Sequence, residues 1–564
     1  MINWERQERS GGDMLKRTAL VCAICAGPCA LIVFAFLIGP AAVKNRPPSG
    51  APNIVLIVAD DLGFSDIGCY GAEIATPNLD QLAARGVRFA QFYNAARCSP
   101  SRASLLTGLY PHQAGVGHQL EDWQAPGYTA GLNERCVTIA ELLQASGYST
   151  YHVGKWHVGG VAQKNERNHP LNRGFDRAYG TGAGGNHFTL GLYDDRKYMK
   201  APDDFYSTDA FADRAVDFIR DHRRQHTEGP FFLHLCFTAP HFPLQARPDD
   251  IERYRGKYAS GWDALRQQRY ARQKELGVID AHWPLSPRDS EAPSWEEVPK
   301  TERAELELRM SIYAAMIDCL DRGVGRVLDE IRQSGCEENT VVIFVSDNGA
   351  SAEVLEPGGE ERPPQPPTAQ STTQPHRSLG AGWANAANTP FRGYKMWLQE
   401  GGISTPLIIS WPGKWKHTGS ITPQVGHIID LMPTCLELAH LKYPQVFEGR
   451  ELTPLAGRSL VPILQGQSPS PRKLAWEHEG NRAIRDGDFK LVADFQGPWQ
   501  LYDLKADRTE TRDLAAQRPD DVTRLSAMWQ SWADQVGVVN WQTLPGSSYR
   551  PSSHYRKKSE PLTR

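Results

Sequence analysis

The stretch Asn53-Ile-Val-Leu-Ile-Val-Ala-Asp-Asp61 is an uninterrupted apolar run that ends in two carboxylates. A short apolar run of this kind is typical of a strand that is buried on both faces of a parallel sheet. Thr76-Pro77 then predicts the start of a helix that Gly86 ends, because threonine caps helices and proline suits the first helical position. Strands that alternate with helices predict a mainly parallel sheet with helices on both faces.

Three further predicted strands also end in polar clusters. A predicted helix runs from Thr138 to about Gly147, and apolar runs predict strands at 148–153, 231–237 and 341–345. In an open parallel sheet, ligands bind at the carboxyl ends of the strands, so these clusters are predicted to meet in one site. The clusters are Gly154-Lys-Trp-His157, Thr238-Ala-Pro-His241 and Ser346-Asp-Asn-Gly349.

Four of these polar residues, Asp60, Asp61, Asp347 and Asn348, offer only oxygen atoms as ligands. Hard oxygen ligands select Ca²⁺ or Mg²⁺ over zinc or copper. The alternative is that the two segments are turn signals, since aspartate, asparagine and glycine favour turns. Their position directly after buried strands favours a metal site.

Cys98-Ser-Pro-Ser-Arg102, which continues to Gly108, predicts a short helix with Cys98 at its N-terminus. The free backbone N–H groups and the helix dipole favour negative charge there, such as that of a sulfate group. The alternative for a lone cysteine is a small buried apolar residue.

The N-terminal segment predicts export. Lys16-Arg17 precede a stretch from Thr18 to Val43 with no charged residue, which is the layout of an export signal. The stretch is also long enough to span a bilayer, so a cleaved signal and a retained anchor both remain open. We expect a periplasmic or extracellular protein, attached to the membrane if residues 18–43 are retained. The cysteines outside this segment show no paired spacing, so one disulfide or none is expected.

Composition gives no sign of a nucleic-acid partner. The chain of 564 residues is 40% hydrophobic and 23% charged, which is ordinary for a soluble globular protein. The formal net charge of -3 provides no basic field. The length predicts more than one structural unit.

The Cys98 segment with its continuation Ala-Ser-Leu-Leu-Thr-Gly108 resembles the first signature of the type I sulfatases, in which this cysteine is oxidised to formylglycine (3-oxoalanine). The stretch Gly147 to His157 resembles their second signature, and similarity extends from Ile54 to about Leu514. The chain looks most similar to bacterial arylsulfatases. The resemblance also covers Asn388-Thr-Pro-Phe-Arg-Gly-Tyr-Lys395, Glu400-Gly-Gly402 and Trp476 to Asp486.

The resemblance implies an alkaline-phosphatase-like α/β fold: a mostly parallel sheet flanked by helices, with a smaller C-terminal α+β domain. It implies hydrolysis of aryl or carbohydrate sulfate esters to an alcohol and inorganic sulfate. Residues 1–50 are interpreted as export signal or anchor plus linker, 51–470 as the catalytic domain, 471–540 as the C-terminal domain and 541–564 as a tail. Within the catalytic domain, 250–310 is interpreted as a helical insertion over the core and 351–380 as a loop.

The resemblance also implies the roles of the site residues. One Ca²⁺ would be held by the four oxygen donors named above, with the group derived from Cys98 beside them as a further ligand. The hydrated aldehyde would attack sulfur, and His157 would take the proton that releases sulfate. Cations on several sides suit a transition state that spreads negative charge over several oxygens. The catalytic residues would be Cys98, Arg102 and Lys155 (which hold the nucleophile), His157, and His241 and Lys395 (which bind sulfate and protonate the leaving group).

Four further histidines lie outside the predicted catalytic set. His187 is interpreted either as a residue of the pocket rim that touches substrate or as an ordinary loop histidine, whereas His112, His118 and His152 are interpreted as structural or as supports behind the site. On an extended strand, Lys155 and His157 would face the same way because they are two residues apart.

The partners would be a sulfated small molecule or glycan and, during maturation, a formylglycine-generating enzyme. A phosphonate monoester or phosphodiester hydrolase of the same fold, and a non-catalytic binding scaffold, remain alternatives.

Overall fold

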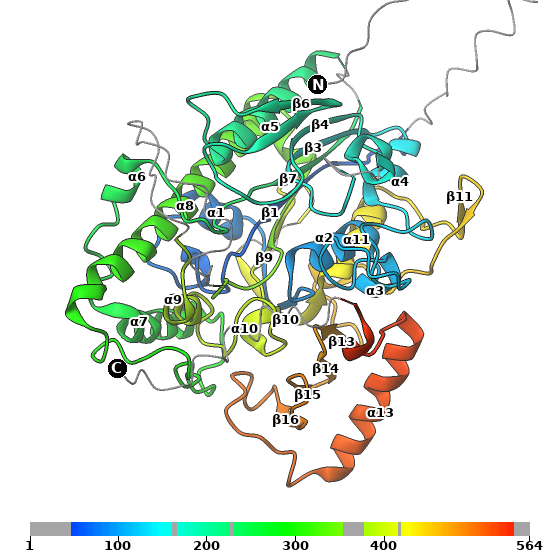
Figure 1. Cartoon of the computed structure of the whole chain (residues 1–564). Coiled ribbons are helices and arrows are strands. Elements are labelled where there is room, and N and C mark those ends of the chain that lie inside the picture. The colour runs from blue at the N-terminus through cyan, green and yellow to red at the C-terminus, as the bar shows by residue number, and fades with distance from the viewer. Residues whose placement is uncertain (1–46, 161–165, 226–228, 354–376, 416–418, 546–564) are drawn as a thin grey trace, which may run out of the picture. The chain divides into compact units, whose positions relative to one another are not determined.

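The computed structural model describes residues 47–160, 166–225, 229–353, 377–415 and 419–545. Among them, a ten-stranded sheet has the order β10-β2-β9-β8-β1-β7-β3-β4-β5-β6 (Figure 1). The five central strands, from β8 to β4, run parallel, whereas β9, β5 and β6 pair antiparallel with their neighbours. The strands are β1 Asn53–Ala59, β2 Val87–Tyr93, β3 Ser149–Lys155, β4 Arg177–Thr181, β5 Gly191–Asp194, β6 Lys197–Lys200, β7 Phe231–Cys236, β8 Thr340–Ser346, β9 Leu407–Ser410 and β10 Ser420–His427.

Strand β1 lies at the centre because its residues are apolar on both faces. Val55 and Ile57 belong to the core on one side of the sheet, and Leu56 belongs to the core on the other side. Side chains alternate between faces along a strand, so an unbroken apolar run can contact two helix layers at once. Val55 pairs in register with Leu233 of β7 and with Val342 of β8.

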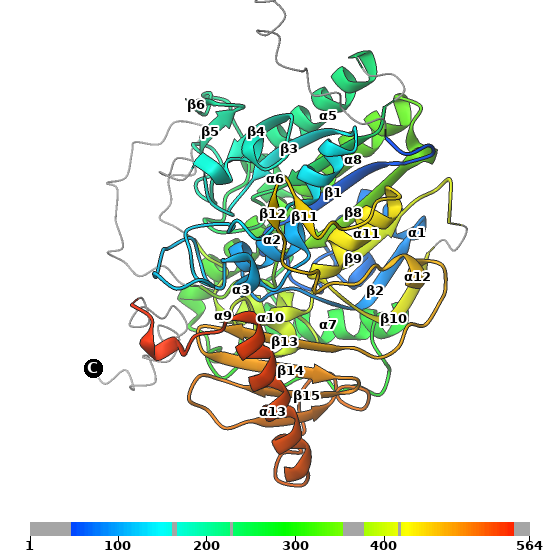
Figure 2. The same cartoon turned by 90° about the vertical axis from the view of Figure 1, so that its right-hand side faces the viewer.

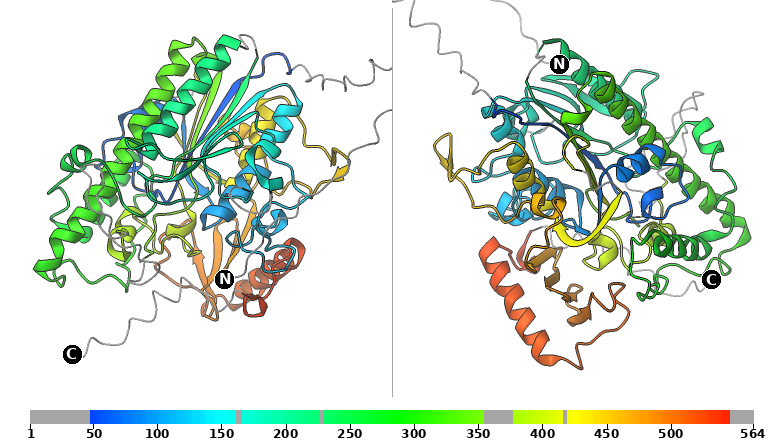
Figure 3. Two further views of the ribbon diagram at one scale, coloured as in Figure 1. Left: turned by 45° about the horizontal axis from the view of Figure 1, so that its top comes forward. Right: turned by 180° about the vertical axis from the view of Figure 1, so that it is seen from behind.

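Helices cover both faces of the sheet. On one side lie α1 Pro77–Ala84, α5 Ser207–Gln225 and α8 Lys300–Gln333; on the other lie α2 Cys98–Thr107, α4 Ile139–Ala145 and α11 Leu431–Leu438. Figure 3 shows this division, with green α5 and α8 opposite blue α2 and yellow α11. The main part of the fold also contains the long helix α7 Gly261–Leu276 and several short helices. The short helices are α3 Pro111–Ala114, α6 Pro248–Glu252, α9 Ala381–Ala387, α10 Glu400–Ile403 and α12 Val461–Leu464.

The start of two helices tests the sequence-based capping prediction. Thr138 caps α4, since its Oγ1 accepts from Glu141 N at 3.1 Å and Glu141 Oε2 accepts from Thr138 N at 2.8 Å. Thr76 precedes α1 as predicted, but its side chain does not cap that helix. Thr76 Oγ1 instead accepts from Gly68 N at 2.8 Å, so it fastens the preceding turn.

The C-terminal part is a four-stranded antiparallel sheet with one helix packed on it (Figure 2). Leu525, Trp529 and Ala533 of α13 pack against Ile484 and Leu491 of the strands. This sheet and helix form the smaller C-terminal α+β unit that the resemblance implied. The elements are β13 Lys473–His478, β14 Asn481–Asp486, β15 Phe489–Ala493, β16 Gln500–Asp503 and α13 Pro519–Val536, preceded by the short pair β11 Val446–Phe447 and β12 Arg450–Glu451.

The structure revises the interpretation of one segment and does not describe most of another. The stretch 250–310 contains α7, but it also contains the start of α8, which continues to Gln333 and forms part of the core. Most of the predicted loop 351–380 and the whole N-terminal export segment lie outside the described residues. The cysteines outside the export segment are all free and buried. Within the described ranges, no helix has both the length and the apolar character needed to cross a membrane.

Candidate active site

The carboxyl ends of the central strands bring the predicted site residues together. Asp60 and Asp61 follow β1, Lys155 is the last residue of β3, and Asp347 with Asn348 follows β8. All five residues are buried. Strands β8 and β1 are adjacent in the sheet, and β7 lies between β1 and β3. Residues almost 290 positions apart in the chain therefore make contact, and Asn348 Nδ2 donates to Asp61 Oδ1 at 2.6 Å.

Cys98 enters this cluster from the α2 side of the sheet. It is the first residue of α2, as predicted, and the helix ends at Gly108, whose φ of 68° is in the left-handed region that glycine tolerates. Cys98 Sγ lies 3.9 Å from Asp61 Oδ1. Burial raises the pKa of the Cys98 thiol to about 12, so the unmodified cysteine is a poor nucleophile near neutral pH.

Two cations neutralise the carboxylates on the inner side of the cluster. Lys155 Nζ donates to Asp60 Oδ2 at 2.7 Å, and Arg102 Nε donates to Asp347 Oδ2 at 2.9 Å. Burial alone would raise the pKa of Asp60, but Lys155 and the other nearby cations hold it well below its usual range. Burial raises the pKa of Asp347 to about 7, with Arg102 acting in the opposite direction.

Lys395 and His241 close the outer side of the cluster. Lys395 Nζ donates to Asp61 Oδ2 at 3.0 Å and lies 3.3 Å from His241 Nε2. His241 Nε2 itself lies 3.6 Å from Asp61 Oδ2. Burial lowers the pKa of His241, which favours the neutral imidazole beside the Lys395 ammonium. Lys395 and His241 therefore present a cation and a neutral ring to the same side of the cluster.

The oxygen atoms of the cluster fit a hard metal ion. Asp60 Oδ1 and Asn348 Oδ1 are buried and have no hydrogen-bond partner in the described part of the chain. Asp60, Asp61, Cys98 and His241 each offer one ligand atom, and these atoms lie within 4.8 Å of one another. Unpartnered buried oxygens are costly unless a cation or a ligand satisfies them.

The structure corrects the argument that placed His157. Strand β3 ends at Lys155, and His157 follows it with a φ of 54°, so side-chain alternation along a strand does not apply. His157 N donates to Gly182 O at 2.9 Å. Burial lowers the pKa of His157 well below its usual value, and Lys155 adds to that effect, so the ring is neutral.

A family model decides the identity of the chain. The sulfatase model matches residues 52–441, which is more than half of the 564 residues. The chain belongs to the sulfatase family. A second model, for the C-terminal part of N-sulphoglucosamine sulphohydrolase, matches residues 393–530 of this sulfatase.

Similar proteins agree with this assignment. The sulfatase is 36% identical to an uncharacterized sulfatase of Schizosaccharomyces pombe, over 88% of this chain and 96% of that protein. It is 34% identical to an arylsulfatase of Klebsiella aerogenes, over 75% of this chain and 94% of that protein. Its fold is similar to the crystal structure of Ps i-CgsB in complex with k-i-k-neocarrahexaose, with a TM-score of 0.64 and 27% identity over 86% of this chain and 93% of that one.

These findings confirm three predictions. The family is correct, the fold is the alkaline-phosphatase-like sheet with a small antiparallel C-terminal sheet, and the chain is a sulfuric ester hydrolase. The roles of the individual site residues and the four domain ranges stay predictions, although the structure brings all the predicted site residues to one end of the sheet.

His187 of this sulfatase is buried behind the residues of the site. His187 is buried, with Nδ1 2.9 Å from Ser207 Oγ and Nε2 3.0 Å from His241 O. Both ring nitrogens are therefore engaged within the protein, which favours the interpretation without substrate contact over that of a rim residue. His187 instead fastens the loop that carries His241.

Sequence reasoning missed Glu353. Its carboxylate lies 2.9 Å from Lys395 Nζ and 3.4 Å from Arg97 Nη2. Burial alone would raise the pKa of Glu353, but Lys395 and Arg97 hold it well below its usual value. Glu353 lies in a segment that was interpreted only as a loop, and no spacing or motif in the sequence connects it with Lys395.

Proposed function

We propose that this sulfatase hydrolyses aryl or carbohydrate sulfate esters with a formylglycine derived from Cys98 and one Ca²⁺ held by Asp60, Asp61, Asp347 and Asn348. The observation that carries the proposal is the position of Cys98 Sγ, 3.9 Å from Asp61 Oδ1 and buried between carboxylates and cations. A bare thiol of raised pKa has little use there, whereas an oxygen nucleophile made from it would be well placed.

The donor set supports calcium. Carboxylate and amide oxygens are the ligands that Ca²⁺ prefers, and two such oxygens of the cluster, on Asp60 and Asn348, have no hydrogen-bond partner among the residues that the structure describes. When bound, Ca²⁺ would supply positive charge that polarises the sulfate group and favours an ionised nucleophile. The formylglycine, when hydrated, would supply the oxygen that attacks sulfur.

The chain's own residues would orient the reacting groups. Arg102 and Lys155 donate to Asp347 and Asp60, so these cations hold the carboxylates in place and keep positive charge beside residue 98. Such preorganised charge stabilises a transition state without reorganisation during the reaction.

Lys395 and His241 would bind the sulfate oxygens. They lie 3.3 Å apart on the outer side of the cluster, and a proton held between Nζ and Nε2 could pass to the leaving alcohol. His157 Nδ1 has no hydrogen-bond partner among the described residues, so it is available to take a proton when sulfate leaves.

The substrate class rests on similar proteins and on the site. One relative is an arylsulfatase, and the structurally similar Ps i-CgsB is in complex with a neocarrahexaose. We therefore propose a sulfated phenol or saccharide as substrate, a formylglycine-generating enzyme as the maturation partner, and export as predicted from residues 18–43.

The test is release of 4-nitrophenol from its sulfate ester by protein coexpressed with a formylglycine-generating enzyme. Cys98→Ala should reduce turnover by roughly 10⁴-fold or more, because it removes the proposed nucleophile. Cys435→Ala, a change at another buried cysteine, should leave turnover unchanged. The corresponding phosphonate monoester is assayed in parallel.

Two outcomes would contradict the proposal. Equal turnover of the sulfate by Cys98→Ala and the unchanged chain would exclude residue 98 as the nucleophile. Cleavage of the phosphonate alone, by protein whose conversion at residue 98 is verified by mass, would assign a phosphonate hydrolase. If conversion is verified and neither ester is cleaved, a panel of sulfated saccharides replaces the aryl ester, and no sulfate release from any of them would reject the proposal.

A further inference from the structure

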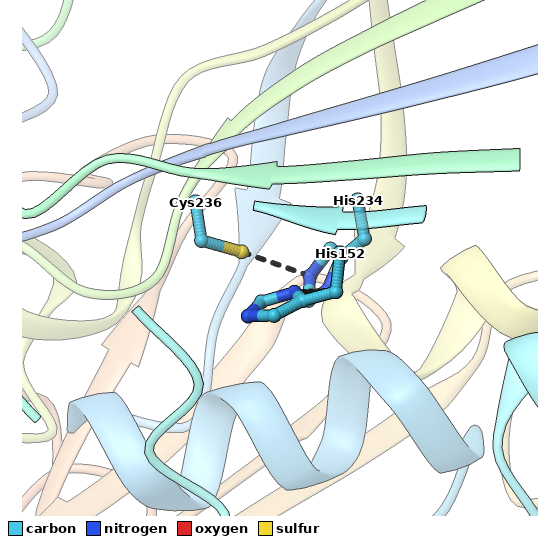
Figure 4. Close-up of side chains that lie close together, drawn as sticks. All are labelled: His152, His234 and Cys236. Atoms are coloured by element: carbon cyan, nitrogen blue, oxygen red, sulfur yellow. Dashed lines mark hydrogen bonds between the residues drawn. The ribbon is translucent and has the colours of Figure 1, made fainter. Parts of the chain in front are cut away.

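A second group of metal-ligand side chains lies along β3 and β7, next to Arg102 of the oxygen cluster but with none of the proposed calcium ligands. His152 of β3 and His234 of β7 are register partners, and Cys236 pairs with Gly154 two residues further along. Figure 4 shows the side chains of His152, His234 and Cys236 together on one face of these strands, with a hydrogen bond between Cys236 and His234. All three are buried, at 1% exposure or less.

The three side chains are in direct contact. Cys236 Sγ lies 3.0 Å from His234 Nε2, and His234 Nδ1 lies 3.1 Å from His152 Nδ1. The two imidazole rings have centroids 5.1 Å apart. One ligand atom from each residue lies within 4.8 Å of the other two.

The group has one ring nitrogen left over. His152 Nε2 is fully buried and has no hydrogen-bond partner in the described ranges. Trp156 and Phe175 pack against the same ring and offer it no acceptor. A buried polar nitrogen without a partner costs about 1–3 kcal/mol, which ordinary core packing would avoid.

We propose that His152, His234 and Cys236 form a buried site for a thiophilic divalent metal ion of the Zn²⁺ type, separate from the oxygen cluster. Two imidazoles and a thiolate are a donor set that zinc accepts and that calcium does not. The ion would take one nitrogen from each ring, together with the sulfur, and leave its fourth position to another ligand.

Cys236 and His234 need only a small adjustment to share an ion, whereas His152 must move further, because it contacts His234 through Nδ1 and Cys236 contacts the same ring through Nε2. Tetrahedral zinc with bonds of about 2.0–2.3 Å separates its ligand atoms by roughly 3.3–3.6 Å. The contact of 3.0 Å between Cys236 Sγ and His234 Nε2 would therefore open by a few tenths of an ångström. Binding would release the thiol proton of Cys236, since the thiolate is the ligand.

The surroundings favour the metal-binding form of both imidazoles, whereas the thiol must lose its proton when metal binds. Burial lowers the pKa of His152 to about 3 and that of His234 well below its usual value, so both rings are neutral and keep a lone pair. Burial raises the pKa of Cys236 to about 12, but the nearby Arg102 guanidinium acts in the opposite direction and favours the thiolate. A cation beside a ligating sulfur is a common way to support it from outside the coordination sphere.

An ion here would fasten the strand ends that carry catalytic side chains. His152 precedes Lys155 by three residues, and Cys236 precedes His241 by five. The ion would thus join β3 to β7 just before the segments that follow these strands enter the active site. Because the ligands are buried, the ion would enter while the chain folds.

The experiment uses the full chain with Cys98→Ser, which removes the thiol of the other cysteine-containing ligand group. Protein is produced in medium that contains Zn²⁺ and purified without chelator; zinc is then counted by mass spectrometry, and its neighbours are identified by X-ray absorption at the zinc edge. We expect one zinc per chain with one sulfur neighbour at about 2.3 Å and the rest nitrogen or oxygen at about 2.0–2.1 Å.

Matched variants locate the ion. Cys236→Ala and His152→Ala should each lose the bound zinc, whereas Cys435→Ala, at a buried cysteine of α11, should keep it. His478→Ala tests the nearby alternative group His118, His478 and Glu479, and it should also keep the zinc.

Three results would overturn the proposal: no zinc in the Cys98→Ser chain, zinc without a sulfur neighbour, or equal zinc content in Cys236→Ala. The absorption spectrum decides the matter even if the Cys236 and His152 variants fail to fold, because it is measured on a chain that keeps all three ligands. Without zinc, the three residues would be a hydrogen-bonded group of the core.

Discussion

Two buried networks of charge in this sulfatase have similar residues and different contacts. The sheet-end cluster consists of the active-site carboxylates with Arg102, Lys155 and Lys395, and the joining network consists of Glu400, Lys490, Arg508 and Glu510. In the joining network, Glu400 Oε1 lies 2.9 Å from Lys490 Nζ, and Glu400 Oε2 lies 2.7 Å from Arg508 Nε. In the sheet-end cluster, Asp60 Oδ1 and Asn348 Oδ1 have no hydrogen-bond partner among described residues.

The difference separates a structural network from a site prepared for a ligand. Glu400 lies in α10, Lys490 lies in β15, and Arg508 follows β16, so their contacts join the main sheet to the C-terminal sheet. Both carboxylate oxygens of Glu400, at the centre of the joining network, are bonded within the protein. Glu510 Oε1 accepts no hydrogen bond by geometry from the part of the chain that the structure describes, but it lies 2.8 Å from Lys490 Nζ. In the sheet-end cluster, Asp60 Oδ1 lies 3.7 Å from Arg102 Nη2, and Asn348 Oδ1 has no hydrogen-bond partner among the described residues, which is the arrangement expected where an ion or a substrate completes the coordination.

The largest expected effect on stability comes from the joining network. Lys490→Met leaves Glu400 and Glu510 buried with less positive charge, and removal of one partner of a buried ion pair typically costs about 3–5 kcal/mol. The free energy of unfolding, measured by urea denaturation, should fall by that amount, while turnover per folded molecule stays near normal. The control is Lys473→Met, at an exposed lysine of β13. An unfolding free energy equal to that of the control would show that the network is not structural.

The reverse result is expected in the sheet-end cluster. Lys395→Met removes the cation that bonds Asp61 and faces His241, so turnover of the aryl sulfate should fall by about 10²–10³-fold, as for loss of one transition-state donor. In the presence of Ca²⁺, its loss of stability should be smaller than that of Lys490→Met. Lys414→Met, at an exposed position, is the control. Near-normal turnover in Lys395→Met would remove Lys395 from the catalytic set.

The smallest expected effect is a dependence of stability on acid pH. Burial would raise the pKa of Glu400, but Lys490 and Arg508 outweigh it and lower the pKa from 4.5 to about 2. A carboxylate with a lowered pKa in the folded state stabilises the protein fully above about pH 4.5, and this stability is lost as the pH falls toward 2. The slope is at most about 1.4 kcal/mol per pH unit for one group, and Glu510, whose pKa is raised, offsets part of it.

The variant that isolates this contribution is Glu400→Gln, which cannot ionise. Its unfolding free energy, measured between pH 5 and pH 2.5, should fall less steeply than that of the unchanged chain. Parallel slopes for the two proteins would mean that Glu400 has the same pKa in the folded and unfolded states.

The sequence predicted those elements whose own residues determine them. The β1 run is apolar on both faces, so only a central position in the sheet buries it. The polar residues after it must then lie at the carboxyl end of the central strands. The helix that begins at Cys98 and the capped start of α4 were also readable, because the relevant residues are neighbours in sequence.

Other features depend on residues that are distant in sequence. Glu353 acquires its role from contacts with Lys395 and Arg97 across the fold, and no local pattern announces them. His157 was expected on a strand, but β3 ends at Lys155 and the chain turns there. The contact between His152 and His234 arises from the parallel register of β3 and β7, which a single sequence does not specify.

The most direct test of the account is the effect of Ca²⁺ on thermal unfolding after chelator treatment. Ligand at about 100 times its dissociation constant stabilises the folded state by roughly 2.7 kcal/mol, so the unfolding midpoint of the sulfatase should rise with added Ca²⁺. Asn348→Ala, which removes one of the unpartnered oxygens, should shift much less at the same concentration. A midpoint that Ca²⁺ leaves unchanged, or an equal shift in Asn348→Ala, would contradict a calcium site at the sheet-end cluster.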